Sequence, residues 1–268
     1  MNKNITIAGL GWLGLPLAQH LKLLGFKVKG SVTDRTKAKA LSAQGIPTFP
    51  LILNEEGISG AVDQLLQVTD VLLVMIPPGL RRDTGSNYAL KMAHFITAIE
   101  NSGIKKAVLV SSTAVYDDTQ GIVTEKDQPK PELNAARQLY EVEQLFFNMP
   151  KLETSIVRFG GLFGGNRNPV KFLAGRSGLR NGNAPVNLIH RKDCIGILTA
   201  IIKQDAFGHI FNAVMPEHPL KKEYYKAQAL QLALEPPHYE EGMGDEVFKQ
   251  VDSVHLSSIL NYTFTYQF

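Results

Sequence analysis

The chain has 268 residues, of which 44% are hydrophobic and 20% charged, and its formal net charge at pH 7 is +3. This length and composition are those of one large globular domain, or of one domain with a small appendage. The few excess cations are dispersed along the chain, so we expect no nucleic-acid partner, because binding a phosphate backbone needs several aligned cations. The longest apolar run, at 71–76, is too short to span a bilayer.

Cysteine usage and the N-terminal residues indicate the compartment. Cys194 is the single cysteine of the sequence, and a lone cysteine cannot form an internal disulfide. Residues 1–4 lead directly into an apolar run and lack the features of a signal peptide. We therefore expect a cytoplasmic protein without a membrane partner.

The first 160 residues alternate short apolar runs with amphipathic stretches, which is typical of a doubly wound parallel sheet. The nearly all-aliphatic run at 70–76 predicts a central strand that is buried on both faces. The expected strands lie at 5–8, 26–32, 48–53, 70–76, 107–111 and 154–158. The expected helices lie at about 13–24, before residue 43, at 88–99 and at 133–147.

The sequence changes character after residue 160. Residues 160–187 are rich in Gly, Asn, Arg and Pro without a clear period, which predicts loops around a site. A helix at 195–202, a strand at 209–213 and a helix at 224–234 follow. We predict an α/β Rossmann-type core over 1–160 and a mixed region over 161–268, in which about 187–213 returns to the core and the rest forms a small C-terminal subdomain.

A glycine-rich turn follows the first strand. It reads Gly9-Leu10-Gly11-Trp12-Leu13-Gly14, the pattern G-x-G-x-x-G between a strand and a helix. In this pattern the first glycine permits a tight turn, the second lets the backbone approach a pyrophosphate, and the third allows close packing of helix on strand. The N-terminus of the helix favours phosphate. We therefore predict a dinucleotide site at Gly9, Leu10, Gly11, Trp12, Leu13 and Gly14.

The end of the second strand decides which dinucleotide is bound. Asp34 lies 20 residues after Gly14, where a carboxylate can hold a ribose 2′-OH and favour NAD. Arg35, followed by two lysines, can instead pair with the 2′-phosphate of NADP, and a third interpretation is that these charges only open a helix. We favour NADP slightly over NAD. The other predicted cofactor contacts lie at strand ends: Thr33, Ile76, Pro77 and Pro78.

The strand at 107–111 runs into three hydroxyl residues and a tyrosine, and ligands bind at such carboxyl ends of parallel strands. The glycine turn, the segment Ser112-Thr113-Ala114-Val115-Tyr116, and the segments 159–164 and 187–193 occur in the order found in extended short-chain dehydrogenases. The chain resembles atypical members of the NAD-dependent epimerase/dehydratase family, which are nucleoside-diphosphate-sugar epimerase-like. Its glycine turn departs from the G-x-x-G-x-x-G that extended members usually carry.

The resemblance implies that Ser112 hydrogen-bonds the reacting oxygen of a substrate, with Thr113 beside it. An alternative is that these hydroxyls only cap the strand end. The family's acid/base element is Tyr-x-x-x-Lys on the next helix, and none of the eight tyrosines has a lysine four residues on. Asn134 or Ala135 stands in the tyrosine position, and Gln138 or Leu139 in the lysine position.

Substitutes for the missing pair lie nearby. Arg137 can supply a cation, and Tyr140 or Tyr116 can supply a phenol. Alternatively, Tyr140 is an ordinary half-buried aromatic residue of an amphipathic helix.

By the same resemblance, Arg167, Arg176 and Arg180 lie in a segment that covers a nucleotide-sugar diphosphate, and guanidinium groups bind phosphate well. A solvated basic loop is the alternative. Asn187 and His190 match the segment that follows the substrate pocket, where His190 is expected to be structural rather than catalytic. Histidines and carboxylates show no metal-ligand spacing.

Two functions therefore stay open. One is an epimerase, dehydratase or reductase acting with NAD(P) on a nucleotide sugar or a related anionic metabolite, bound by a substrate-binding C-terminal subdomain. The other is a non-catalytic, NADP-binding regulatory protein. The resemblance also implies a homodimer formed through the helices at about 86–102 and 133–147.

Overall fold

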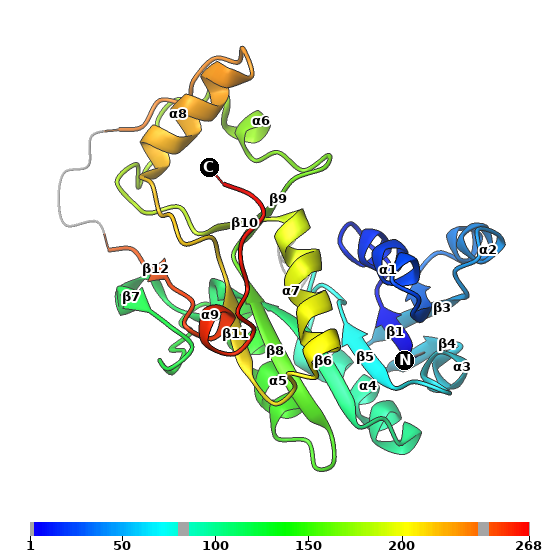
Figure 1. Cartoon of the computed structure of the whole chain (residues 1–268). Helices are drawn as coiled ribbons and strands as arrows, with labels where there is room; N and C mark the ends of the chain where they lie inside the picture. Colours follow the sequence, from blue (N-terminus) through cyan, green and yellow to red (C-terminus); the bar gives the residue numbers. More distant parts are fainter. Residues whose placement is uncertain (1–2, 80–85, 241–246, 268) are drawn as a thin grey trace.

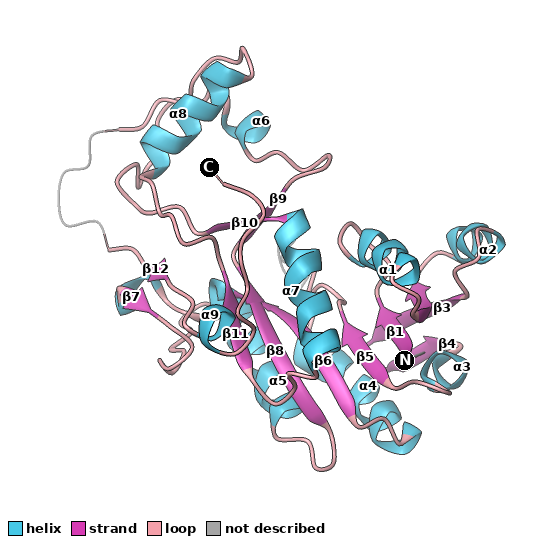
Figure 2. Cartoon of the chain, in the orientation of Figure 1, coloured by secondary structure: helices cyan, strands magenta, loops and turns pink. Residues whose placement is uncertain are grey.

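The computed structural model describes residues 3–79, 86–240 and 247–267. A single large sheet forms the centre of the molecule, with helices on both of its faces (Figures 1 and 2). The strands of this sheet are β1 (Asn4–Ala8), β2 (Lys27–Val32), β3 (Thr48–Asn54), β4 (Gly57–Gly60), β5 (Val71–Val74), β6 (Lys106–Ser112), β8 (Glu153–Phe159) and β11 (Ile210–Ala213). The main helices are α1 (Gly14–Leu23), α2 (Arg35–Ala43), α3 (Val62–Leu66), α4 (Tyr88–Ser102), α5 (Asn134–Phe147), α7 (Arg191–Gln204) and α9 (His255–Ser258).

The strand order in the sheet is β11-β8-β6-β5-β1-β2-β3-β4. All neighbouring strands are parallel except β3 and β4, which are antiparallel. Strand β1 lies between β2 and β5, so the chain changes its direction of travel across the sheet at β1. Ligands of open α/β sheets bind outside the carboxyl ends of the strands at such a switch point. The predicted Rossmann-type α/β fold is confirmed, and the glycine turn lies at its switch point.

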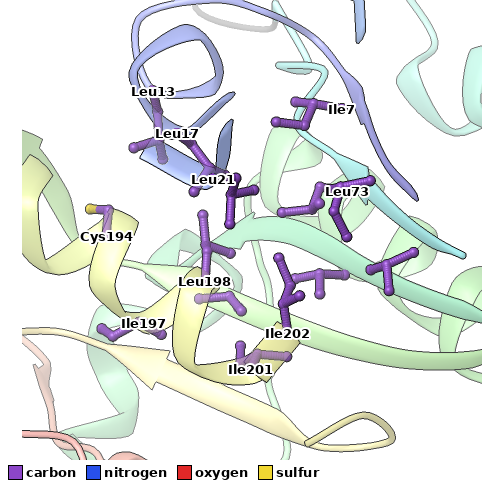
Figure 3. Close-up of a cluster of buried hydrophobic side chains, with 14 of the residues drawn as sticks. Ile7, Leu13, Leu17, Leu21, Leu73, Cys194, Ile197, Leu198, Ile201 and Ile202 are labelled. Atoms are coloured by element: carbon purple, nitrogen blue, oxygen red, sulfur yellow. The ribbon is translucent and has the colours of Figure 1, made fainter. Parts of the chain in front are cut away.

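Alternation along the strands separates two hydrophobic layers, because successive side chains of a strand point to opposite faces. Ile7 and Leu73 belong to one layer with the apolar faces of α1 and α7, and Figure 3 shows Leu17 of α1 beside Leu198 of α7 over these strands. The other layer packs α3, α4 and α5 against the alternate strand positions, such as Leu72. Both layers consist of side chains with almost no exposed surface.

Smaller elements lie beyond the sheet. Strand β9 (Gly161–Phe163) pairs in parallel with β10 (Leu188–His190), and β7 (Ile122–Val123) pairs in parallel with β12 (Gln250–Val251). Two helices, α6 (Val170–Leu173) and α8 (Lys221–Gln231), pack together with β9, β10 and the C-terminal residues Phe264 and Tyr266 in a separate hydrophobic cluster.

Some sequence-based boundaries were wrong. Residues 160–187 were predicted as loops, yet they contain β9 and α6. Strand β9 is three residues long and pairs with residues 27 positions later, so no local periodicity reveals it. Strand β4 and helix α3 were not predicted, and β5 is shorter than the run at 70–76. Helix α7 begins at Arg191 rather than at 195, because His190 caps it by accepting a hydrogen bond from the Lys192 N–H.

The C-terminal residues are held by one buried carboxylate. Asp193, on α7, accepts hydrogen bonds from the Tyr262 hydroxyl at 3.0 Å and from the Thr265 N–H at 2.7 Å. Burial raises the pKa of Tyr262, and the contact with the Asp193 carboxylate raises it further. In the described residues, no helix has the length and apolar character that crossing a membrane requires.

Candidate functional site

The three glycines of the turn have different surroundings. Gly9 has φ = 115°, and a Cβ there would lie 2.7 Å from the carbonyl oxygen of Met75. A Cβ at Gly14 would lie 2.1 Å from the Gly9 carbonyl oxygen. Both glycines are therefore required by the fold itself. A Cβ at Gly11 would meet no described atom within 4 Å, so Gly11 opens onto free space.

Helix α1 begins without a side-chain cap, unlike α2 and α4 but like α3 and α5. Asp34 caps α2 and Asn87 caps α4, each by accepting a backbone hydrogen bond with its side chain. At α1 the capping position is Leu13, and no side chain of the described residues caps the helix. The first N–H groups of a helix have no partner within it, so this uncapped end can receive an anion.

The other residues of the turn are fixed by packing. The Leu10 N–H donates to the Ser31 carbonyl at 2.7 Å, which ties the turn to β2, and Leu10 and Leu13 are buried in the α1/α7 layer. Trp12 is half-buried, and its indole N–H donates to the Asn166 side-chain oxygen at 2.9 Å.

Charged residues surround the end of β2. Thr33, Asp34 and Arg35 are all exposed. One carboxylate oxygen of Asp34 accepts the Lys37 N–H at 2.5 Å, as the helix-opening interpretation predicts. The Lys37 ammonium group donates to the Leu10 carbonyl at 3.2 Å, so a cation lies directly against the glycine turn.

The chain leaves β5 beside this turn. The Ile76 carbonyl accepts the Tyr88 hydroxyl at 3.0 Å, which connects this strand end to α4. Ile76 and Pro78 are half-buried and Pro77 is exposed. These three residues thus border the switch point where the prediction put the cofactor.

The end of β6 presents the predicted active-site hydroxyls. Ser112 is half-buried, and its hydroxyl oxygen accepts the Ala114 N–H at 3.2 Å, capping a short helical turn (Thr113–Val115). Its O–H hydrogen remains able to donate. Thr113 is 7% exposed, so of this pair Ser112 is the one that a ligand can reach.

A fully buried polar network lies behind these hydroxyls. Arg158 of β8 and Glu143 of α5 form an ion pair at 2.6 Å with side chains only 1% and 0% exposed. Ser111 donates to the same carboxylate at 2.6 Å, and Arg158 donates to the Tyr116 hydroxyl at 2.7 Å. Tyr116 in turn donates to the Thr124 carbonyl at 2.8 Å.

Tyr116 was proposed as a phenol of the proton relay, and its location does not fit that role. Its exposed fraction is 0%, and its hydroxyl is engaged by the network. Burial raises the pKa of Tyr116, and the nearby Arg158 guanidinium only partly opposes this. Glu143 and Arg158 were missed by the sequence analysis. The available signal was an arginine and a glutamate at otherwise apolar positions of β8 and α5.

Helix α5 carries the positions of the missing Tyr-x-x-x-Lys. Ala135 and Leu139 are half-buried, and the Gln138 side-chain oxygen accepts the Tyr88 N–H at 2.6 Å. Arg137 is exposed, and its side chain donates to the Pro131 carbonyl at 3.2 Å. Tyr140 is half-buried against a small apolar cluster around Val115, which agrees with its interpretation as a packed aromatic residue.

The three predicted substrate arginines are all exposed, but they lie in different places. The Arg167 guanidinium carbon is 4.7 Å from the centre of the Trp12 ring, at the glycine turn. The Arg176 carbonyl accepts the His238 N–H at 2.8 Å, and Leu179, next to Arg180, bridges to Tyr239. Arg176 and Arg180 thus belong to the part of the molecule around α6 and α8, and of the three only Arg167 is shown beside the glycine turn.

Asn187 and His190 are engaged by the protein. The Asn187 amide donates to the Lys249 carbonyl and accepts the Val251 N–H, both at 2.9 Å, so it holds β12 in place rather than being free for a substrate. His190 stacks on Tyr266 at 4.4 Å between ring centroids, and burial lowers its pKa. Its carboxylate neighbour on α7, Asp193, binds the C-terminal residues.

Two further observations concern other possible ligand sites, a cavity and a metal site. A cavity of about 630 Å³ lined by Lys3, Asp70 and Lys106 lies at the amino ends of the strands, the edge opposite to the glycine turn. We do not assign it to the cofactor, because dinucleotides bind at carboxyl ends. Within residues 3–79, 86–240 and 247–267 there is no cluster of three metal-ligating side chains.

Comparison with solved structures defines the class of fold. A short-chain dehydrogenase/reductase superfamily protein from Agrobacterium tumefaciens with bound NAD superposes with a TM-score of 0.78 at 16% identity, covering 98% of this chain and 93% of that one. UDP-glucose 4-epimerase from Thermotoga maritima, solved with UDP-glucose, gives a TM-score of 0.79 at 15% identity over 98% and 94% of the two chains. The chain therefore has the fold of NAD-dependent epimerases and short-chain dehydrogenases, as its motifs suggested.

Sequence comparison identifies the family within that fold. No protein-family model matches the chain. Protein YeeZ of Escherichia coli K12 is 32% identical over 266 residues, which are 98% of this chain and 96% of that protein. The chain belongs to the same family as Protein YeeZ.

Proposed function

We propose that this protein binds NAD(P) with its pyrophosphate over Gly11 and at the N-terminus of α1. The observation that carries the proposal is the contrast among the three glycines. Gly9 and Gly14 are required by backbone crowding, whereas Gly11 has free space where any other residue would place a side chain. An uncapped helix end beside that space supplies the N–H groups that a phosphate needs.

We favour NADP as the dinucleotide. One oxygen of Asp34 is engaged in capping α2, while the Lys37 ammonium lies against the Leu10 carbonyl and Arg35 is exposed next to it. A 2′-phosphate on the adenosine ribose would meet these cations, whereas a bare ribose would use only the carboxylate. The solved structure from A. tumefaciens contains NAD, so both cofactors belong in the test.

We further propose that the reaction is epimerase- or reductase-like and acts on a nucleotide sugar or a related anionic metabolite. The bound dinucleotide would supply hydride transfer at a carbinol carbon. Ser112, half-buried at the end of β6 with its O–H hydrogen able to donate, would hold the reacting oxygen. Tyr140 and Arg137, three residues apart on α5, remain the proposed sources of a phenol and a cation. UDP-glucose in the T. maritima structure supports this choice of substrate class.

A second function is favoured by one observation. The two α5 positions where a phenol and an ammonium group would stand hold residues without either group, whichever alignment is used. A protein with this substitution can bind the dinucleotide as a sensor without turning it over. Cofactor binding is common to both functions, and turnover separates them.

The first experiment measures cofactor binding by the wild type and by Gly11→Val. We expect the wild type to bind NADPH, and the variant to bind at least about tenfold more weakly because its side chain fills the phosphate space, a difference of about 1.4 kcal/mol. The melting temperature should change little, because nothing described lies within 4 Å of the added Cβ. Gln19→Ala, on an exposed position of the same helix, is the matched control.

Equal affinity of wild type and Gly11→Val for both NADPH and NADH would contradict the proposed site. Turnover is then tested by incubating the wild type with NADP⁺ or NAD⁺ and a panel of nucleotide sugars, with chromatography of the products. Epimerised or oxidised sugar that disappears in Ser112→Ala supports the enzyme. Cofactor binding without turnover of any of these sugars supports the sensor.

A further inference from the structure

Two arginines from the second half of the chain meet the glycine turn at one side chain. The guanidinium carbons of Arg167 and Arg191 lie 4.7 and 5.1 Å from the centre of the Trp12 ring. Trp12 is the residue directly after Gly11. The space that we assign to a diphosphate is therefore bordered by two cations that are more than 150 residues away in the sequence.

Both arginines are held there by their own surroundings. Arg167 ends a tight turn in which Gly164 and Arg167 exchange backbone hydrogen bonds at 2.8 and 3.1 Å. Asn166 in this turn accepts the indole N–H of Trp12. A Cβ at Gly165 would lie 2.4 Å from the Arg191 guanidinium, so the absence of a side chain at Gly165 makes room for that group.

Helix packing brings Arg191 to this location. Arg191 is the first residue of α7, and the apolar faces of α7 and α1 belong to one hydrophobic layer. In Figure 3 the side chains from Leu13 to Leu21 on α1 and from Cys194 to Ile202 on α7 progress in the same direction, so the two helices run parallel. The N-termini of α1 and α7 therefore lie on the same side of the molecule.

The two arginines bring positive charge to the same side chain. Two guanidinium groups around one indole repel each other, and their attraction to the ring face only partly offsets this. No carboxylate among the described residues forms an ion pair with Arg191. An organic diphosphate, with two negative charges and acceptor oxygens that match guanidinium, is the ligand chemistry that fits.

We propose that Arg167 and Arg191, aligned by Trp12, form a clamp on a nucleotide diphosphate, and that this diphosphate is the pyrophosphate of the dinucleotide bound at Gly11. The assignment to the cofactor rests on the proposed function and on Trp12, which is part of the cofactor turn itself. The clamp would couple the two ligand sites, because Arg167 opens the segment expected to cover the substrate. Cofactor binding would then hold the turn at 164–167 in place before a substrate enters.

The test compares Arg167→Gln, Arg191→Gln and the double variant with the wild type by calorimetry. The probes are NADP⁺, NAD⁺, ADP-ribose, which has the diphosphate without nicotinamide, and UDP. Lys171→Gln is the matched control, since Lys171 is an exposed cation on α6, four residues after Arg167. Arg191→Lys tests geometry, because an ammonium group keeps the charge without the planar double contact.

We expect each single variant to weaken NADP⁺ and ADP-ribose binding about threefold to tenfold, and the double variant more than tenfold. UDP binding should stay unchanged, Arg191→Lys should recover only part of the affinity, and the salt dependence of NADP⁺ binding should fall in the double variant.

Four results would overturn the clamp. Loss of UDP binding with unchanged cofactor binding would assign the arginines to a substrate diphosphate instead. If the arginine variants bind every probe with unchanged affinity but melt at a lower temperature, the contacts of Arg167 and Arg191 with Trp12 only stabilise the fold. If the wild type binds neither NADP⁺ nor NAD⁺, the proposed function is wrong and the clamp with it. If the wild type binds NADP⁺ and the double variant binds it with the same affinity, only the clamp is wrong.

Discussion

Two regions at the carboxyl edge of the sheet differ in whether their polar and charged groups are exposed or are buried and bonded to one another. Around the glycine turn, several groups are open to solvent: Gly11 is uncrowded, Arg35 is exposed and α1 begins without a side-chain cap. Behind the ends of β6 and β8, Glu143 and Arg158 are buried and bonded to each other. Polar groups that satisfy one another stabilise the fold, whereas groups left open at a strand end are the ones that can bind a ligand.

This difference changes how the predicted active site is interpreted. Tyr116 looked like a catalytic phenol because it follows the hydroxyl cluster of β6. It belongs instead to the buried network around Glu143 and Arg158, where its hydroxyl lies between Arg158 and the Thr124 carbonyl. Ser112 lies at the border between the two regions, and it is the hydroxyl that we retain for the reaction.

The largest expected effect is a loss of stability when one partner of the buried Glu143–Arg158 ion pair is removed. Arg158→Met should lower the free energy of unfolding by about 3–5 kcal/mol, because it leaves the fully buried Glu143 carboxylate without its counter-charge. Chemical denaturation measures this change. Arg137→Met, at an exposed position of α5, is the control and should stay within about 0.5 kcal/mol of the wild type.

The double variant Arg158→Met/Glu143→Met sharpens the same test. Removing both charges should recover much of the lost stability, because no unpaired ion is then buried. If Arg158→Met alone lowers the free energy of unfolding by less than about 1 kcal/mol, the buried network does not have the structural role that we assign to it.

A smaller effect is expected at the open region, in the choice of cofactor. Arg35→Ala/Lys37→Ala should weaken NADP⁺ binding about tenfold and leave NAD⁺ binding nearly unchanged, because only NADP⁺ carries the 2′-phosphate. Calorimetry with both cofactors measures the ratio, and Lys39→Ala, an exposed lysine on α2, is the control. An equal loss of affinity for both cofactors would show that Arg35 and Lys37 do not contact the 2′-phosphate.

The smallest expected effect is on the pH dependence of stability, and it concerns His190, which ends β10 and caps α7. Burial lowers the folded-state pKa of His190 below its ordinary value of 6.5. The unfolded chain therefore binds more protons than the folded chain below about pH 6.5, so the stability that neutral His190 provides is lost as the pH falls. His190→Asn keeps a residue that can cap α7 and should flatten the dependence of melting temperature on pH between 7 and 5. An unchanged slope would assign the acid sensitivity to other groups.

Local patterns were enough for much of the fold. Apolar runs of period two and helical runs of period 3.6 are properties of neighbouring residues, and they predicted β1, β2, β6, α4 and α5 within a few residues. The G-x-G-x-x-G spacing predicted the turn at the switch point for the same reason. The pairing of β9 with β10 was not predictable in this way, since the two strands are far apart in the sequence and only three residues long.

What the sequence determined by itself is the Rossmann-type order of elements and the location of the glycine turn, because both depend on contacts between residues close in the chain. Only the tertiary structure decided which polar residues are open and which are buried. Glu143 and Arg158 find each other on different elements, and Trp12 meets Arg167 and Arg191 only after α7 has packed on α1. Burial and pairing of charges are set by such long-range contacts, so the same residue types became a structural network in one region and a proposed diphosphate clamp in the other.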